Sequence, residues 1–220
     1  MAPRFLLALA LLAPAAACSR QPASGFTGDQ TRQYLIAVGR VRKVINNDNR
    51  ERMPALIRGQ DLEMLGDEAN RIEKDKQDLL KLPAAGVDPG AVDFVRHFLA
   101  ILDAYKAVCV DTGELLREVI RDDAANGGPS PLMPAIKSGL QIVQPDTIST
   151  VGSLVDRLDQ LDAAAKEHAV FLNPIAARVR EDRDKLAAAK QAEHAFTAKA
   201  KLDLAARYPD IDWTSRELLP

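Results

Sequence analysis

The sequence predicts an all-α protein, an antiparallel up-and-down bundle of four or five helices without a sheet. Apolar side chains recur at alternating spacings of three and four residues over most of the chain. Alanine and leucine dominate and aromatic residues make up only 5%, a mixture that suits closely packed helices. Runs of β-branched and aromatic residues that alternate with polar ones, the usual sign of a strand, do not occur.

The composition excludes several classes of protein. Apolar residues make up 47% of the 220 residues, which argues against a disordered chain. The formal net charge is −2, so charge gives no reason to expect nucleic acid or anionic lipid as a partner.

The first helix is expected to begin near Asp29, because Thr27 and Gln30 stand three apart as in a capping box. One apolar stripe follows, at Tyr34, Val38, Val41 and Ile45. The polar run over residues 46–49 is typical of a turn, so the helix is expected to end there.

A second helical segment is expected to open at Met53-Pro54, since proline is accepted in a first helical turn. Gly59 weakens this segment and favours a start near Gln60. The apolar stripe beyond it consists of Leu62, Leu65, Ala69, Ile72 and Leu79. Pro83 and Gly86 should close the helix.

The third helix, opened by Asp88 as N-cap and Pro89, is the most apolar in the chain. Two adjacent stripes give it a wide buried face. They consist of Phe94, Phe98, Ile101, Tyr105, Val108, Thr112, Leu115 and Val119, and of Val95, Leu102, Cys109 and Leu116. We expect this helix to be central to the bundle and Cys109 to be an unreactive core thiol.

The breakers in residues 126–131 should end that helix. A short helix is expected over residues 134–143, and a long one over residues 146–172. Asn173 as cap and Pro174 as first residue would turn the chain by a kink or tight corner. The last helix should end near Arg207, and the tail with Trp213 should fold back onto the bundle.

Residues 1–17 have the features of a bacterial export signal, with Arg4, an apolar stretch and small residues at the end. The apolar stretch covers about nine residues, whereas a bilayer span needs roughly 20. Ala15-Ala16-Ala17-Cys18 resembles the lipobox of bacterial lipoproteins. The resemblance implies cleavage before Cys18 and attachment of a diacylglyceryl lipid to its thiol. Ala15 stands where the family usually has leucine, and it also fits an ordinary secretory site.

We therefore expect three parts: a signal peptide over residues 1–17, the lipidated Cys18 with a flexible tether over residues 18–28, and one helical domain over residues 29–220. Ser19 after the cysteine favours, in the lipoprotein family, anchoring in the outer membrane with the domain facing the periplasm. A soluble periplasmic protein is the alternative.

No catalytic or metal-binding motif occurs. Gly-x-Ser-x-Gly, Ser-x-x-Lys, phosphate-binding glycine loops, haem attachment sites and paired-cysteine zinc patterns are missing. None of the three histidines has the Glu three residues before it that di-iron bundles need. The sequence therefore predicts no enzyme, no bound metal and no cofactor.

Three side chains are weak candidates for binding. His168 falls within the apolar stripe of residues 146–172, and Arg178 and Arg180 belong to a mixed-charge run that is typical of a solvated helix face. The sequence favours an envelope lipoprotein that binds a protein partner or acts as a scaffold. The alternative is a periplasmic bundle that binds a ligand or metal in a pocket near His168. Other roles, such as neutralising a toxin, remain open.

Overall fold

The computed structural model describes residues 25–126, 130–142, 144–213 and 218. All regular structure in these residues is helical, so the all-α prediction is confirmed. The elements are α1 (Gly28–Asn47), the π-helix η1 (Asp48–Arg52), α2 (Met53–Gly59), α3 (Leu62–Leu80), α4 (Pro89–Ala125), α5 (Leu132–Leu140), α6 (Thr147–Asp159), α7 (Ala163–His168), the 3₁₀-helix η2 (Ala169–Leu172) and α8 (Asn173–Arg207). Cys18 and the expected signal peptide lie outside the described residues.

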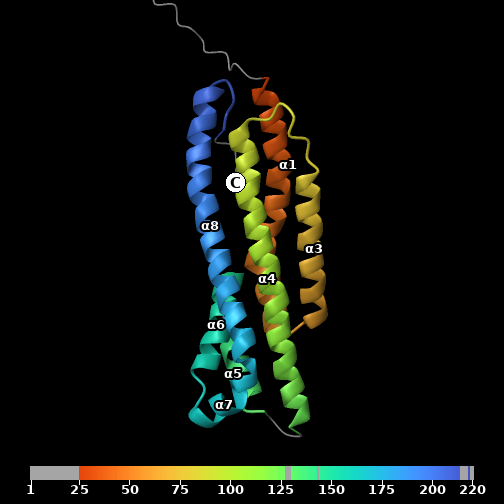
Figure 1. Ribbon diagram of the computed structural model, residues 1–220, viewed down its shortest axis with the longest axis vertical. Coiled ribbons are helices and arrows are strands. Elements are labelled where there is room, and N and C mark those ends of the chain that lie inside the picture. Colours follow the sequence, from red (N-terminus) through yellow and green to blue (C-terminus); the bar gives the residue numbers. More distant parts are fainter. Residues whose placement is uncertain (1–24, 127–129, 143, 214–217, 219–220) are drawn as a thin grey trace, which may run out of the picture.

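The molecule is elongated, with α1, α3, α4 and α8 along its long axis (Figure 1). In this view α1 and α4 run downward, whereas α3 and α8 return upward, and α5, α6 and α7 gather at the lower end. The largest packing contacts join α4 to α8 and α3 to α4. The described residues contain eight α-helices rather than four or five. Four of them, α1, α3, α4 and α8, are long, and the other four are short.

Helix α4 is the centre of the core, as predicted. It has 37 residues, which span about 55 Å. Both predicted stripes are buried along their whole length. Burial of a large apolar side chain stabilises the fold by about 2 kcal/mol, so this one helix contributes much of the gross folding energy.

The start of α1 is confirmed, because the Thr27 side chain accepts a hydrogen bond from the Gln30 N–H at 3.2 Å. The turn expected over residues 46–49 is wrong. The chain stays helical and passes through η1 into α2, with the Met53 N–H bonded to the carbonyl of Asp48 five residues earlier. Contacts to other helices, described below, hold this polar run in a helical form that its composition alone disfavours.

Helix α3 begins close to Gln60, where the sequence favours a start, but the residues before it form a separate helix, α2. Gln60 adopts a left-handed conformation, with φ of 55°, and the Asp61 N–H bonds the carbonyl of Leu56 at 3.1 Å. Asp61 then caps α3 by accepting from the Met64 N–H at 3.1 Å. In the predicted stripe of α3, Leu62 is partly buried against the core, and the other residues, Leu65, Ala69, Ile72 and Leu79, are buried.

The single long helix expected over residues 146–172 is wrong. Helix α6 ends at Asp159, and Asp162 starts α7 by accepting from the Ala165 N–H at 2.8 Å. Asn173 does not act as a cap, because it already has helical dihedrals as the first residue of α8. Pro174 fits this first turn, where an N–H would have no partner.

The tail folds back as predicted. Trp213 is buried, and its indole N–H donates to the carbonyl of Tyr208 at 3.0 Å. The start of α1 passes so close that a Cβ at Gly28 would lie 2.7 Å from Ile211 Cδ1. No helix in the described ranges is both long enough and apolar enough to cross a bilayer.

Candidate ligand-binding cavity beside the π-helix

A cavity of about 670 Å³ lies between α1, α4, α8 and the N-terminal end of α6. This volume falls within the range of small-molecule sites. Its apolar wall comes mainly from Ile45 of α1 and from Phe98, Ile101 and Tyr105 of α4. These four side chains belong to the buried core, so the wall is fixed by the packing of the bundle.

One charged pair at the cavity is neutralised within the protein, although Arg42 Nη1 makes only this ion pair and no hydrogen bond to the described residues. Arg42 and Glu193 meet in a two-pronged ion pair, with Nη1–Oε1 at 3.1 Å and Nη2–Oε2 at 3.2 Å. Thr197 also donates to Glu193 Oε1 at 2.7 Å, and the Arg42 guanidinium lies 5.5 Å from the Phe94 ring centroid. Burial lowers the pKa of Arg42, and Glu193 opposes that shift. The two charges neutralise each other and join α1 to α8.

Two other cations at the cavity, Arg50 and Lys190, lack such a partner. Neither forms an ion pair or side-chain hydrogen bond with any residue that the structure describes. Burial lowers the pKa of Lys190, Arg50 lowers it further, and Asp146 raises it. Asp146 is at the same time the N-cap of α6, accepting from the Ser149 N–H at 2.9 Å.

Asn49 lines the cavity, and its side chain carries a buried polar atom without a partner. The residue is only 8% exposed, and its side-chain Oδ1 has no hydrogen-bond partner within the described part of the chain. Buried polar atoms in native proteins are nearly always hydrogen-bonded. Among the residues that line the cavity, Asn49 therefore supplies an acceptor that a ligand N–H or O–H group would satisfy.

A chain of hydrogen bonds fixes the π-helix at this point. Thr147 donates its hydroxyl to the carbonyl of Asn49 at 3.1 Å. The hydroxyls of Tyr105 and Thr147 lie 3.3 Å apart, and Tyr105 must be the donor because Thr147 has only one hydroxyl proton. Helices α4 and α6 thus hold η1 from the cavity side. π-Helical turns often occur at functional sites.

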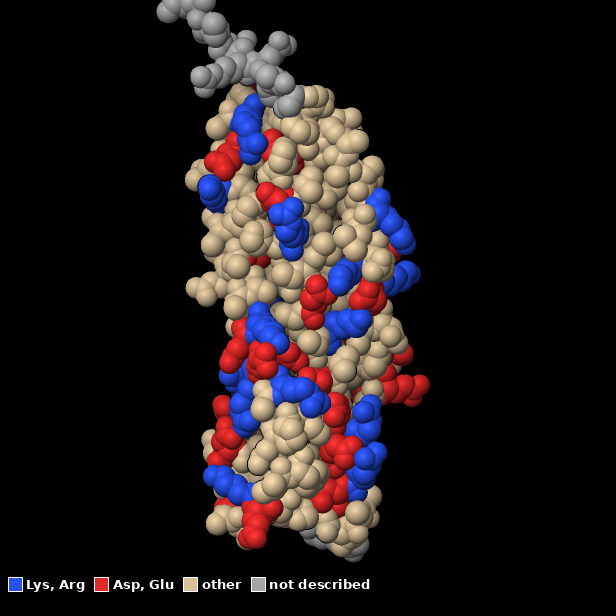
Figure 2. Space-filling model, viewed as in Figure 1, with Lys and Arg blue, Asp and Glu red and all other residues tan. Residues whose placement is uncertain are grey.

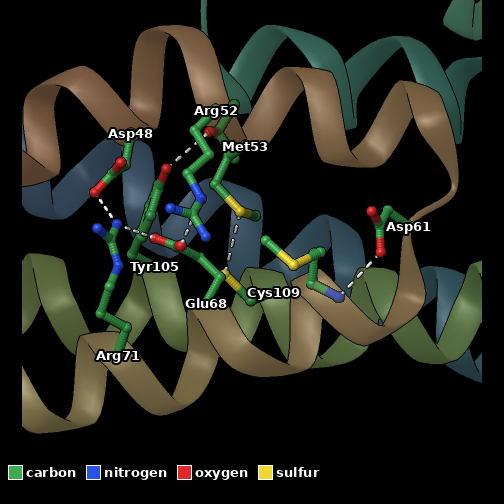
Figure 3. A network of polar contacts seen from close by, with 10 residues as sticks. Asp48, Arg52, Met53, Asp61, Glu68, Arg71, Tyr105 and Cys109 are labelled. Atoms are coloured by element: carbon green, nitrogen blue, oxygen red, sulfur yellow. Dashed lines mark hydrogen bonds and ion pairs between the residues drawn. The ribbon is translucent and has the colours of Figure 1, made fainter.

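Next to Tyr105, η1 also contacts a buried ion cluster (Figure 3). Glu68 of α3, with no side-chain exposure, lies between Arg71 at 2.6 Å and Arg52 Nε at 3.2 Å. Arg71 also pairs with Asp48. Burial raises the pKa of Glu68, although Arg52 lowers it. Two arginines balance two carboxylates, so the cluster is neutral and anchors the π-helix to α3, although Glu68 Oε2 and Arg71 Nε have no hydrogen-bond partner among the described residues.

His168 does not line this cavity. Its Nε2 lies 2.9 Å from both carboxylate oxygens of Asp122, and the buried Ser130 donates to Asp122 Oδ2 at 2.6 Å. Serine and histidine thus share one carboxylate but do not bond each other, whereas an activated serine must donate to its base. The arrangement joins the end of α4 to α7. Because the helix is broken before α7, His168 does not continue the apolar stripe of α6, although its spacing in the sequence suggests that it would.

Arg178 and Arg180 also form ion pairs within the protein. Arg178 contacts Asp111 at 3.1 Å and Glu114 at 2.6 Å, both on α4, and Arg180 contacts Asp159 of α6 at 2.5 Å. Arg180 also lines a separate cavity of about 190 Å³. Figure 2 shows Lys and Arg interleaved with Asp and Glu over the lower half of the face seen in Figure 1. The structure therefore does not bring the three predicted candidates together in one site.

The residues at the large cavity were missed by the sequence reasoning. Asn49 and Arg50 fell in the run interpreted as a turn, and Lys190 lies on α8, where polar residues such as Glu193 and Thr197 are buried. No local pattern distinguishes these residues from solvated ones. The one available signal was the lack of glycine and proline in the polar run over residues 46–52, which indicates that the helix can continue there.

Within the described ranges, no group of three or more His, Cys, Asp or Glu residues converges on a point where it could hold a metal. Comparisons of the chain with protein-family models, with curated proteins and with solved structures give no match.

Proposed function

We propose that the chain is a non-enzymatic binding protein of the bacterial cell envelope that holds a small molecule between α1, α4 and α8. The observation that carries this proposal is the unpaired Asn49 Oδ1, buried beside a cavity of about 670 Å³. Two cations without ion-pair partners among the described residues, Arg50 and Lys190, lie at the same cavity.

The proposal places the protein outside the cytoplasm, anchored by lipid on Cys18 and held by the short tether. In this account α1, α3, α4 and α8 act as one antiparallel up-and-down bundle that supports the cavity. Mass spectrometry of the N-terminal peptide tests the anchor. The account predicts a chain that begins at a diacylglyceryl-modified Cys18. A chain that begins at an unmodified Cys18 would favour the soluble periplasmic alternative, and one that retains residues 1–17 would refute export.

Native mass spectrometry of the protein isolated from cell envelopes tests the binding role. Asn46→Trp puts an indole at the cavity mouth from an exposed position of α1. Lys43→Trp is its control, on the same helix and also exposed, but not part of the cavity lining. We expect a small-molecule adduct on the wild type and on Lys43→Trp, and little or none on Asn46→Trp. An adduct of equal abundance on all three would show that the cavity is not the site.

A protein-binding role is the second candidate. The observation that favours it is the exposure of Val170 (58%) and Phe171 (42%) in η2, at the end of the molecule far from α1's first turn. Crosslinking in intact cells, with the wild type and a Val170→Ser/Phe171→Ser variant, tests it. A partner that is lost in the variant supports this role, and equal recovery from both rejects this surface.

A further inference from the structure

The charge at the cavity favours an anion. Arg42 and Glu193 neutralise each other in their two-pronged pair. Apart from Glu193, the described carboxylate that lines the cavity is that of Asp146. It already accepts a hydrogen bond from the first turn of α6, so it only partly balances Arg50 and Lys190. The site therefore has an excess positive charge. An anion near Lys190 would also offset the burial of its ammonium group, because a nearby opposite charge favours the ionised form.

The remaining lining adds two requirements. Asn49 Oδ1 can only accept a hydrogen bond, so the ligand should carry an O–H or N–H group. Phe98 and Ile101 present a fixed apolar wall from α4, and a flat or aliphatic face of the ligand would pack there.

We infer, on the basis of the proposed function, that the cavity takes a small organic anion with an apolar face and a hydroxyl or N–H donor. Arg50 and Lys190 bind the carboxylate or phosphate group, Asn49 accepts from the donor, and Phe98 and Ile101 contact the apolar face. These residues come from η1, α4 and α8, so the site exists only when the bundle is assembled.

A matched series of four compounds tests the ligand class on the purified full chain, by calorimetric titration. In this series 4-hydroxyphenylacetate has the anion and the donor, phenylacetate lacks the donor, 2-(4-hydroxyphenyl)ethanol lacks the charge, and tyramine reverses it. We expect 4-hydroxyphenylacetate to bind most tightly and tyramine least. Phenyl phosphate in place of phenylacetate shows which anionic head group is preferred.

Substitutions assign the contacts. Lys190→Met should weaken 4-hydroxyphenylacetate about tenfold, as loss of one charged hydrogen bond does, and should leave 2-(4-hydroxyphenyl)ethanol nearly unchanged. Arg40→Met is the control, because it removes an exposed charge from α1 away from the cavity. Asn49→Ala should abolish the preference for 4-hydroxyphenylacetate over phenylacetate. The comparison between compounds needs no variant and stands even if Asn49→Ala does not fold.

The outcomes separate the two proposals. If tyramine or 2-(4-hydroxyphenyl)ethanol binds as tightly as 4-hydroxyphenylacetate, the cavity binds ligands but the inferred anion is wrong. If Lys190→Met and Arg40→Met weaken binding equally, the anion is attracted by the positive charges of the protein in general and not by a contact with Lys190. If none of the four compounds binds, the inferred ligand class is wrong, and the small-molecule role is then decided by the adduct in native mass spectrometry.

Discussion

Thr147 donates its hydroxyl proton to the carbonyl oxygen of Asn49 at 3.1 Å and so ties the first turn of α6 to the π-helix. The two residues are 98 positions apart in the chain. Because Tyr105 donates to the same threonine oxygen, one buried hydroxyl links α4, α6 and the π-helix beside the cavity.

Replacement of this hydroxyl should be costly. Thr147→Val keeps the shape but leaves the Asn49 carbonyl and the Tyr105 hydroxyl unpaired, so the free energy of unfolding should fall by about 2–3 kcal/mol. Urea denaturation measures this loss. Thr150→Val is the control, since Thr150 is equally buried but bonds only the Asp146 carbonyl of its own helix. Equal losses in both variants would show that the link across helices adds nothing.

The buried ion cluster should depend on charge. Glu68→Gln leaves Arg52 and Arg71 without their shared carboxylate, and loss of one partner from a buried pair costs about 3–5 kcal/mol. Denaturation of this variant should show that loss. Glu63→Gln, an exposed position on the same helix, should change stability by no more than about 0.5 kcal/mol. A Glu68→Gln protein as stable as the wild type would mean that the arginines are solvated.

Acid should weaken the contact between α4 and α7. Burial raises the pKa of Asp122, but hydrogen bonds from Ser130 and His168 lower it more, and the net pKa is lowered. The unfolded chain therefore takes up this proton first as the pH falls, and stability is lost from about pH 4 downward. The stability difference between the wild type and Asp122→Asn should shrink over that range.

Unfolding curves between neutral pH and acid measure this difference. Asp159→Asn serves as the control, because that carboxylate is 63% exposed in its pair with Arg180. A difference for Asp122→Asn that stays constant through the acid range would contradict the lowered pKa.

The turn between α2 and α3 offers a stabilising substitution. Gln60 has a φ of 55°, and its side chain makes only a long contact to the Met133 sulfur at 3.5 Å. Glycine favours this helix-ending conformation, so Gln60→Gly should raise the free energy of unfolding by about 0.5–1 kcal/mol. Gln60→Ala removes the same side chain but keeps Cβ, and it should give no gain. Equal effects of the two changes would place the cause in the side chain.

The sequence predicted those elements whose pattern is local. Both stripes of α4, the Thr27 cap and the buried Trp213 follow from apolar spacing and capping chemistry. The breaks were harder to predict. Asp162 starts a new helix although the apolar spacing in the sequence continues through this point. The polar run at Asp48 stays helical because residues of α3 and α6 bind it.

The candidate site could not be predicted for a related reason. Asn49, Arg50 and Lys190 come from segments that no local pattern brings together, and the helix between Asn173 and Arg207 buries acidic and polar side chains as well as apolar ones. His168, Arg178 and Arg180 stood out for their residue type, yet each contacts a carboxylate within the protein. Which cations lack a partner is a property of the assembled bundle.

A crystal structure of the full chain, isolated under native conditions from the envelopes of the cells that make it, tests the central claim most directly. The account predicts density for an organic anion in the cavity, with an oxygen about 3 Å from Lys190 Nζ and a donor at a similar distance from Asn49 Oδ1. A cavity that holds only water, or that is closed by its own side chains, would contradict it.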